Sequence, residues 1–184
     1  LYIVGVGARI ASGHSLTSIH PATGDVLGEV PRADEEDVNR AVAAAQRAFA
    51  DWQHVPSTER ANCLERLAER VVEHTNELAL IDAYDAGNAV SGMRGDMKIA
   101  ADAIKYFAAM IREVKGETQL SKPRHVNMTL RQPFGVVGKI NPFNHPFRFC
   151  AEKVAAPLAA GNTVVVKQPE QAPLSGLRFG ELCD

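Results

Sequence analysis

The spacing of apolar residues changes near residue 120 of this 184-residue chain. Before that point, apolar side chains recur at intervals of three and four residues, which predicts three consecutive amphipathic helices. These helices are expected to begin near Asp34, Ser57 and Gly95. The apolar stripes expected to face a core are Val38, Val42, Ala45 and Phe49, then Leu64, Leu67, Val71 and Leu78, then Ile99, Ala103, Tyr106 and Met110. Three successive helices form a layer that must pack against another element.

Two segments on either side of these helices have the pattern of antiparallel strands. Residues 16–30 contain two short apolar runs around Pro21, Gly24 and Asp25, which favours a hairpin. Residues 124–132 alternate polar and apolar side chains, as an exposed strand does. Because the sequence offers this strand no local partner, it is expected to have an edge that needs pairing.

The last third of the chain has the pattern of a βαβ unit. Residues 134–140 (FGVVGKI) and 163–167 (TVVVK) are apolar runs typical of buried parallel strands. Residues 147–160 favour a helix between them, and a further helix is expected from about Leu174. In such sheets, ligands bind beyond the carboxyl ends of the strands, so the chemistry is expected after residues 140 and 167.

Composition and charge narrow the classes of protein to which the chain can belong. Hydrophobic residues make up 46% of the chain and charged residues 23%, which is ordinary for a globular protein. The formal net charge of −2 gives no sign of binding to nucleic acid or to a membrane, and no apolar run is long enough to span a bilayer. The three cysteines, Cys63, Cys150 and Cys183, lack the spacing of a zinc site and are expected to be reduced thiols in a cytoplasmic protein. No metal site is predicted.

A Gly-x-Gly pattern near the N-terminus is a weak signal for dinucleotide binding. Gly5 and Gly7 begin the pattern, but Ile10 occupies the third glycine position and no strand–turn–helix pattern surrounds it. We therefore expect a loop or strand there, and any nucleotide to bind elsewhere.

The segment after the first apolar strand holds an asparagine between two prolines. Pro142 and Pro146 restrict the backbone on both sides of Asn144, whose carboxamide could donate a hydrogen bond into the space above the sheet. A rigidly held neutral donor of this kind suits a developing oxyanion. The alternative is that Asn144 caps the following helix, which is a common role for asparagine.

A lysine and a glutamate follow the second apolar strand. Lys167 ends the strand and Glu170 comes three residues later, where an acidic side chain can accept hydrogen bonds from the hydroxyls of a bound ribose. The alternative is an exposed lysine at a strand end and a glutamate that merely precedes the next helix.

Three stretches together resemble the aldehyde dehydrogenase superfamily, and the resemblance covers nearly the whole chain. They are PFGVVGKINPFNHPF, AAPLAAGNTVVVKQPEQAPLS and HPATGDVLGEVPRADEEDVNRAVAAA. The resemblance implies an α/β fold, namely the N-terminal part of a Rossmann-type cofactor-binding domain. Residues 1–120 would form its hairpin and helical layer, residues 121–133 a β-ribbon for oligomerisation, and residues 134–184 its first, incomplete βαβ unit.

The resemblance also implies roles for individual residues. Asn144 would donate to the oxyanion of a thiohemiacetal, and Lys167 and Glu170 would hold the adenosine ribose of NAD, with NADP as a second possible cofactor. Glu170 favours NAD because its charge repels a 2′-phosphate. The remaining residues implied at the cofactor cleft are Ile140, Asn141, Pro142, Phe143 and Pro169.

Four further residues match positions that face the aldehyde tunnel in the family: Ile99, His145, Arg148 and Phe149. Several of them are polar, which favours a polar or charged aldehyde over a long alkanal. The alternative is that Arg148 pairs with Glu152 on the surface of the helix.

The family oxidises an aldehyde to a carboxylic acid through a cysteine thioester, with a glutamate-activated water. Neither the nucleophile nor this base matches a residue of this chain, so the 184 residues alone are expected to be inactive and the catalytic domain to lie outside them. The full-length protein is expected to be a homodimer or homotetramer. A CoA-acylating semialdehyde dehydrogenase and a non-catalytic nucleotide-binding or interaction module remain as alternatives.

Overall fold

A computed structural model describes residues 2–3, 6–7 and 13–184. Gly5 and Ile10 of the N-terminal glycine pattern therefore lie outside the described residues. The helices are α1 (Glu35–Trp52), α2 (Ser57–Glu73), α3 (Thr75–Ala86), α4 (Val90–Met110), a short 3-10 turn (Ile111–Glu113), α5 (Pro146–Ala159) and α6 (Leu174–Leu182). The strands are β1 (Tyr2–Ile3), β2 (Val6–Gly7), β3 (Ser15–Ile19), β4 (Val26–Pro31), β5 (Thr118–Lys122), β6 (His125–Met128), β7 (Val136–Ile140) and β8 (Thr163–Lys167).

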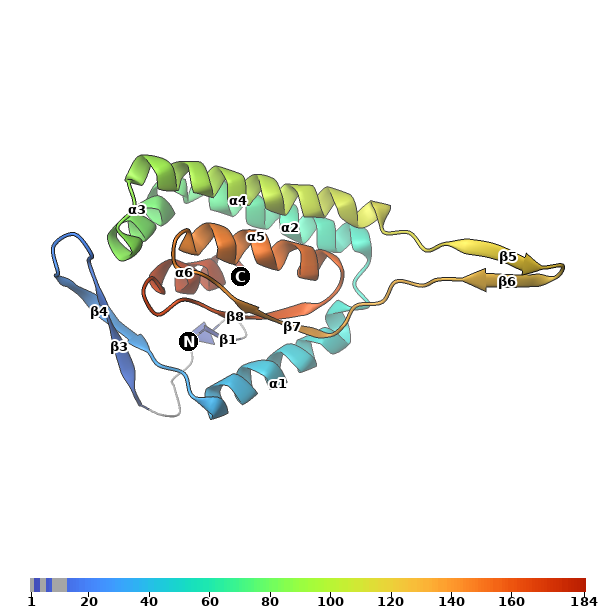
Figure 1. Cartoon of the computed structure of the whole chain (residues 1–184), viewed down its shortest axis with the longest axis horizontal. Coiled ribbons are helices and arrows are strands. Elements are labelled where there is room, and N and C mark those ends of the chain that lie inside the picture. Colours follow the sequence, from blue (N-terminus) through green and yellow to red (C-terminus); the bar gives the residue numbers. More distant parts are fainter. Residues whose placement is uncertain (1, 4–5, 8–12) are drawn as a thin grey trace.

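The elements are stacked in layers around a parallel pair of strands (Figure 1). β7 and β8 run in register from Val136 opposite Thr163 to Ile140 opposite Lys167, which confirms the predicted βαβ unit. α1 packs on one face of this pair and α5 on the other, and α2, α3 and α4 lie on the outer side of α5. No helix in the described part of the chain is long and apolar enough to cross a membrane.

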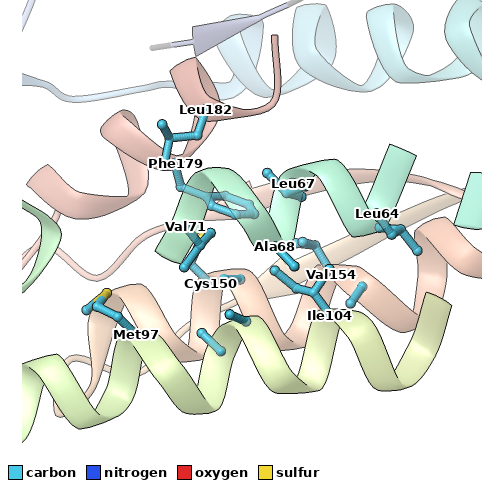
Figure 2. Packing of buried hydrophobic residues seen from close by; sticks show 14 of the residues in the cluster. Leu64, Leu67, Ala68, Val71, Met97, Ile104, Cys150, Val154, Phe179 and Leu182 are labelled. Carbon is cyan, nitrogen blue, oxygen red and sulfur yellow. The ribbon is translucent and has the colours of Figure 1, made fainter. Parts of the chain in front are cut away.

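The hydrophobic core lies between α2, α4, α5 and α6 (Figure 2). At its centre the rings of Phe147 and Phe179 meet edge to face with centroids 5.7 Å apart, a favoured aromatic geometry. Cys150 is buried in the same cluster, beside α2. α5 thus buries one flank in this core and turns the other toward the strands, which fixes the position of its N-terminus.

The first helix begins where the sequence predicts. The Asp34 carboxylate accepts a hydrogen bond from the Asp37 amide at 3.0 Å, and the Asp37 carboxylate accepts one from the Asp34 amide, which forms a capping box. Val38 is nonetheless half exposed, because it lies in a shallow open groove that Val42 and Val165 also line. The hairpin predicted over residues 16–30 is confirmed as β3–β4.

The second predicted helix is two helices. α2 ends at Glu73 and α3 starts at Thr75, with His74 between them. Leu78 therefore belongs to the buried stripe of α3 and not to that of α2. As predicted, Gly87 ends this region, since it adopts the left-handed conformation (φ 77°) that favours glycine.

The third predicted helix, α4, begins at Val90, five residues before the expected start. The prediction of which face of this helix is buried is wrong. Ile99, Tyr106 and Met110 are exposed. The side chains that α4 buries are Met93, Asp96, Met97, Ala100, Ala101, Ile104 and Ala108. Small alanines on this face let α2 and α5 approach closely, whereas the bulkier stripe points outward.

The predicted β-ribbon has a local partner that the sequence did not reveal. β6 pairs with β5 in an antiparallel arm that extends away from the body of the molecule (Figure 1). Every residue of both strands is exposed. The two apolar strands of the βαβ unit are also less buried than predicted: Phe134 is 98% exposed and Ile140 83% exposed.

Candidate functional site

The two segments predicted to carry the chemistry leave the sheet side by side. Ile140 and Lys167 are register partners at the carboxyl ends of β7 and β8. The Asn141 amide then donates to the Lys167 carbonyl at 3.1 Å, which extends the ladder by one residue. Residues 141–145 and 168–173 therefore begin from adjacent points and share one edge of the molecule.

The first segment presents an exposed wall with one side chain turned inward. Ile140, Pro142 and Phe143 are exposed, whereas Asn141 is 6% exposed. The Nδ2 atom of Asn141 has no hydrogen-bond partner among the described residues. An unpartnered buried amide beside an open edge is unusual, because such groups normally find a partner or a water.

Asn144 does not cap the following helix. α5 begins at Pro146 with His145 as its N-cap, and the His145 side chain makes no capping hydrogen bond. Asn144 is exposed, and its backbone carbonyl accepts a hydrogen bond from Nδ2 of Asn88 at 2.9 Å. The capping alternative is therefore wrong, and the carboxamide is left accessible at the edge where the strands end.

Three of the four predicted tunnel residues are in contact. The rings of His145 and Phe149 meet edge to face at 5.8 Å, and the Arg148 guanidinium lies 5.8 Å from the centre of the Phe149 ring. Ile99 is exposed on α4, one helical turn beyond Asp96.

The charge of Arg148 is balanced by two carboxylates. Its Nη1 lies 3.7 Å from Asp96, and its Nε donates to Glu152 at 3.3 Å. The predicted Arg148–Glu152 pairing is thus present, as is a second partner that the sequence did not suggest. Asp96 also lies 2.5 Å from Nδ1 of His145.

The lysine and glutamate after β8 are close and accessible. Lys167 Nζ lies 4.0 Å from a carboxylate oxygen of Glu170, and both side chains are more than half exposed. A pair this exposed contributes little to stability. Pro169, between them, is buried and anchors the loop.

Two buried carboxylates of α3 hold the N-termini of the two helices that follow the strands. Asp82 accepts from the Phe147 amide of α5 at 3.2 Å, and Asp85 accepts from the Leu174 amide of α6 at 2.8 Å. Asp85 also accepts from the Ser18 hydroxyl at 2.6 Å. Burial raises the pKa of Asp82 to about 6 and also raises the pKa of Asp85.

None of the three cysteines has the surroundings of a catalytic thiolate. Cys150 is fully enclosed in the core, and burial raises the pKa of its thiol. Cys63 lies half buried on α2, and Cys183 follows α6. In the described ranges, no group of three or more histidine, cysteine or acidic side chains is arranged to hold a metal ion.

The sequence profile of the aldehyde dehydrogenase family matches residues 9–184. The chain belongs to the aldehyde dehydrogenase family. Its fold is that of the N-terminal portion of such enzymes, as the sequence motifs implied.

Three related proteins illustrate the match. Aldehyde dehydrogenase tropH of Talaromyces stipitatus is 41% identical over 170 residues, which cover 91% of this chain and 33% of tropH. The crystal structure of PnpE in complex with nicotinamide adenine dinucleotide has a TM-score of 0.96 at 36% identity, covering 100% of this chain and 38% of PnpE. An NADP-dependent enzyme of E. coli has a TM-score of 0.96 at 31% identity, covering 99% of this chain and 38% of the enzyme. This aldehyde dehydrogenase chain therefore spans between 33% and 38% of these relatives.

Sequence reasoning missed three side chains that hold the Asn144 segment, namely Asn88, Asp82 and Asp96. A signal for Asp96 existed: it interrupts the buried stripe of α4 between Met93 and Met97. Charged side chains are rarely buried without a partner, so an aspartate on an apolar face indicates a specific contact.

Proposed function

We propose that this chain supplies the cofactor cleft and the oxyanion donor of an enzyme that oxidises an aldehyde to a carboxylic acid with NAD. The observation that carries the proposal is the Asn144 carboxamide. It is exposed at the carboxyl edge of the βαβ unit, is not used as a helix cap, and is backed by a hydrogen bond from Asn88 to its own carbonyl. Membership of the aldehyde dehydrogenase family gives this donor a reaction in which an oxyanion develops.

The residues at the strand ends fit the adenosine ribose of a dinucleotide. Lys167 can donate and Glu170 can accept, and with 4.0 Å between their charged groups they can address neighbouring hydroxyls of one sugar. The inward-turned Asn141 leaves an exposed wall of Ile140, Pro142 and Phe143 for the rest of the cofactor. The dinucleotide, when bound, would supply the acceptor for the hydride.

In the proposed mechanism, a cysteine thiolate attacks the aldehyde carbon and the carbonyl oxygen becomes an oxyanion. Nδ2 of Asn144 donates to that oxygen, and other oxyanion donors suggest that it lowers the barrier by about 3 kcal/mol. Pro142 and Pro146 limit the motion of the donor before the reaction begins. Oxidation leaves a thioester, and water activated by a glutamate base then hydrolyses it and releases the carboxylic acid.

The thiolate and the base are proposed to come from outside the 184 residues. Cys150 is enclosed in the core with a raised pKa, and Cys63 is on α2, on the far side of α5 from the strands.

The three-part division into residues 1–120, 121–133 and 134–184 is retained as a proposal, with the ribbon arm widened to start at Thr118. Because all of this arm is exposed, it supports assembly of the full-length protein into a dimer or tetramer.

The identity of the aldehyde is less defined than the sequence suggested. Arg148 is paired with Asp96 and Glu152, so its charge no longer supports the expectation of a polar or charged aldehyde. The partly buried aromatic contact of His145 with Phe149 remains available to an uncharged polar or aromatic substrate.

The proposal is tested with the full-length protein, NAD and a panel of alkyl, aromatic, hydroxylated and carboxylated aldehydes. Aldehyde-dependent formation of NADH is expected with at least one class, and none is expected from residues 1–184 alone. If the full-length protein formed no NADH with any aldehyde, the proposed function would be wrong. Turnover by the isolated 184 residues would contradict the assignment of the nucleophile to another part of the protein.

A further inference from the structure

We propose that Asp96 is a positioning residue for Asn144 and that it acts through His145. The inference rests on the proposed function, since it concerns the geometry of the oxyanion donor. Asp96 is on α4, and His145 directly follows Asn144 in the chain.

The contact between Asp96 and His145 is short and is shielded from water on the Asp96 side, while the His145 side chain is 37% exposed. Oδ2 of Asp96 lies 2.5 Å from Nδ1 of His145, and the Asp96 side chain is 7% exposed. An ionised carboxylate can only accept hydrogen bonds, so Nδ1 of His145 carries the proton and donates it. Charge-assisted bonds of this kind are about twice as strong as neutral ones.

This contact is one of three that fix the segment carrying Asn144. Asn88 donates to the Asn144 carbonyl at 2.9 Å, and Asp82 accepts from the Phe147 amide at 3.2 Å. All three anchoring side chains come from α3, α4 or the loop that joins them, so one rigid helical unit holds the segment from outside. Pro146 adds a covalent restraint, because it limits the backbone of His145.

Of these three anchors, Asp96 is the one that contacts a side chain of the segment, that of His145, which is next to Asn144. His145 is the N-cap of α5 but makes no capping bond, so the bond to Asp96 is the polar contact that orients its ring. Losing that bond frees His145 to rotate, and the backbone of Asn144 can then shift with it. A shift of about 1 Å in a positioned group can reduce a rate by about a hundredfold.

A purely structural role for Asp96 is the competing explanation. Asp96 also lies 3.7 Å from Arg148, and a buried carboxylate with a cationic partner affects folding whether or not it serves catalysis. Comparing the single variants of Asp96 and Asn144 with the double variant separates a structural role from a positioning role. A residue that acts through Asn144 has no effect on kcat once the Asn144 carboxamide is gone.

The experiment measures kcat, the KM for aldehyde and the affinity for NAD in the full-length enzyme. The variants are Asp96→Ala, Asp96→Asn, His145→Ala, Asn144→Ala and the double variant Asp96→Ala with Asn144→Ala. Asp85→Asn is the matched control, since Asp85 is an equally buried carboxylate that caps α6 and does not contact the Asn144 segment. His145→Ala breaks the same bond from its more exposed side, so the test stands even if Asp96→Ala folds poorly.

We expect Asp96→Ala and His145→Ala each to lower kcat about ten- to hundredfold while NAD affinity stays within about threefold. Asp96→Asn keeps an acceptor for Nδ1 and is expected to retain most of the turnover. In the Asn144→Ala background, Asp96→Ala should lower kcat no further. Asp85→Asn keeps an acceptor for the Leu174 amide and is expected to leave kcat within about threefold of the wild type.

Two results would overturn the inference while leaving the proposed function intact. One is a kcat for Asp96→Ala and His145→Ala within about threefold of the wild type. The other is an equal loss of kcat in the presence and in the absence of the Asn144 carboxamide. If Asn144→Ala itself kept full turnover, the role of Asn144 as oxyanion donor would fail, and this inference would fail with it.

Discussion

Three aspartates on α3 and α4 hold the starts of α5 and α6 in place near the candidate site. Asp82, Asp85 and Asp96 are buried, and each accepts a hydrogen bond from a group at or near the start of α5 or α6. Helix N-termini favour negative charge, because their first amides lack partners within the helix. Asp82 and Asp85 therefore act as capping groups that are distant in sequence, whereas Asp96 contacts the His145 ring.

Asp82 should make the stability of the fold depend on pH. Its pKa in the folded protein is raised to about 6, chiefly by burial. The folded state therefore binds more protons than the unfolded state between about pH 4 and pH 6, so this contribution to stability falls as the pH rises through that window. At neutral pH the cost of ionising Asp82 is about 3 kcal/mol.

Asp82→Asn removes that cost while keeping an acceptor for the Phe147 amide. In melting curves of the full-length protein, the gain in melting temperature of Asp82→Asn over the wild type should be larger at pH 7.5 than at pH 5. Asp102→Asn, at an exposed position of α4, serves as the control and should show no such difference. A gain for Asp82→Asn that is the same at both pH values would contradict the raised pKa.

Glu170 should set the preference between the two cofactors. Glu170→Gln removes the charge that repels a 2′-phosphate and weakens acceptance from the ribose hydroxyls. The ratio of kcat/KM for NAD to that for NADP is expected to fall at least tenfold, which corresponds to the loss of one charge-assisted bond. Glu65→Gln, on the exposed face of α2, is the control. An unchanged ratio would remove Glu170 from the ribose site.

The residues of the candidate site that belong to sequence motifs could be predicted from the sequence. The residues that reach the site through tertiary contacts could not. Asn144, Lys167 and Glu170 follow predictable strands, so their common edge could be inferred from topology. The bond from Asp96 to His145 spans 49 residues and depends on which face α4 buries. Because that face was mispredicted, the anchor of the segment could not be found.

At the scale of elements, the face of α4 that the hydrophobic pattern predicts to be buried is not the face that packs against the core. The bulky stripe of Ile99, Tyr106 and Met110 has helical spacing, yet the buried face carries mainly alanine and methionine. Close helix packing selects small side chains, so the most hydrophobic stripe of a helix need not be the one that faces the local core. The break between α2 and α3 at His74 was missed for a related reason, since a short interruption barely disturbs the apolar periodicity.

Gly116 should control the ribbon arm. A Cβ atom at this position would lie 2.0 Å from the Thr129 carbonyl oxygen. Next to it, the Thr129 amide donates to Glu117 at 2.9 Å and the Glu117 amide donates to the Thr129 hydroxyl at 2.8 Å. Gly116→Ala therefore forces the base of the arm apart, at a cost of about 1–3 kcal/mol.

The readout for Gly116→Ala is the mass distribution of the full-length protein by sedimentation. We expect a larger share of monomer than in the wild type, because the arm is the proposed contact between subunits. Gly92→Ala is the matched control: a Cβ at Gly92 on α4 meets open space. Unchanged assembly of Gly116→Ala would count against the arm as the oligomerisation segment.

For the molecule as a whole, the order of elements and the βαβ unit were predictable, while the degree of burial was not. The apolar runs over residues 134–140 and 163–167 led to the expectation of buried strands, but Ile140 at the end of β7 and Phe134, two residues before β7, are almost fully exposed. A parallel sheet normally has both faces and both neighbours covered, and two strands cannot achieve this. The chain spans only about a third of the length of its relatives, which is consistent with these apolar surfaces being open.

The central claim is that Asn144 stabilises an oxyanion during aldehyde oxidation. The most direct measurement compares the kcat of Asn144→Ala with that of the wild type in the full-length enzyme, together with NAD affinity. We expect a loss of about 10²- to 10³-fold in kcat with NAD affinity unchanged, because the donor acts on the reacting oxygen and not on the cofactor. A kcat within about threefold of the wild type would contradict it.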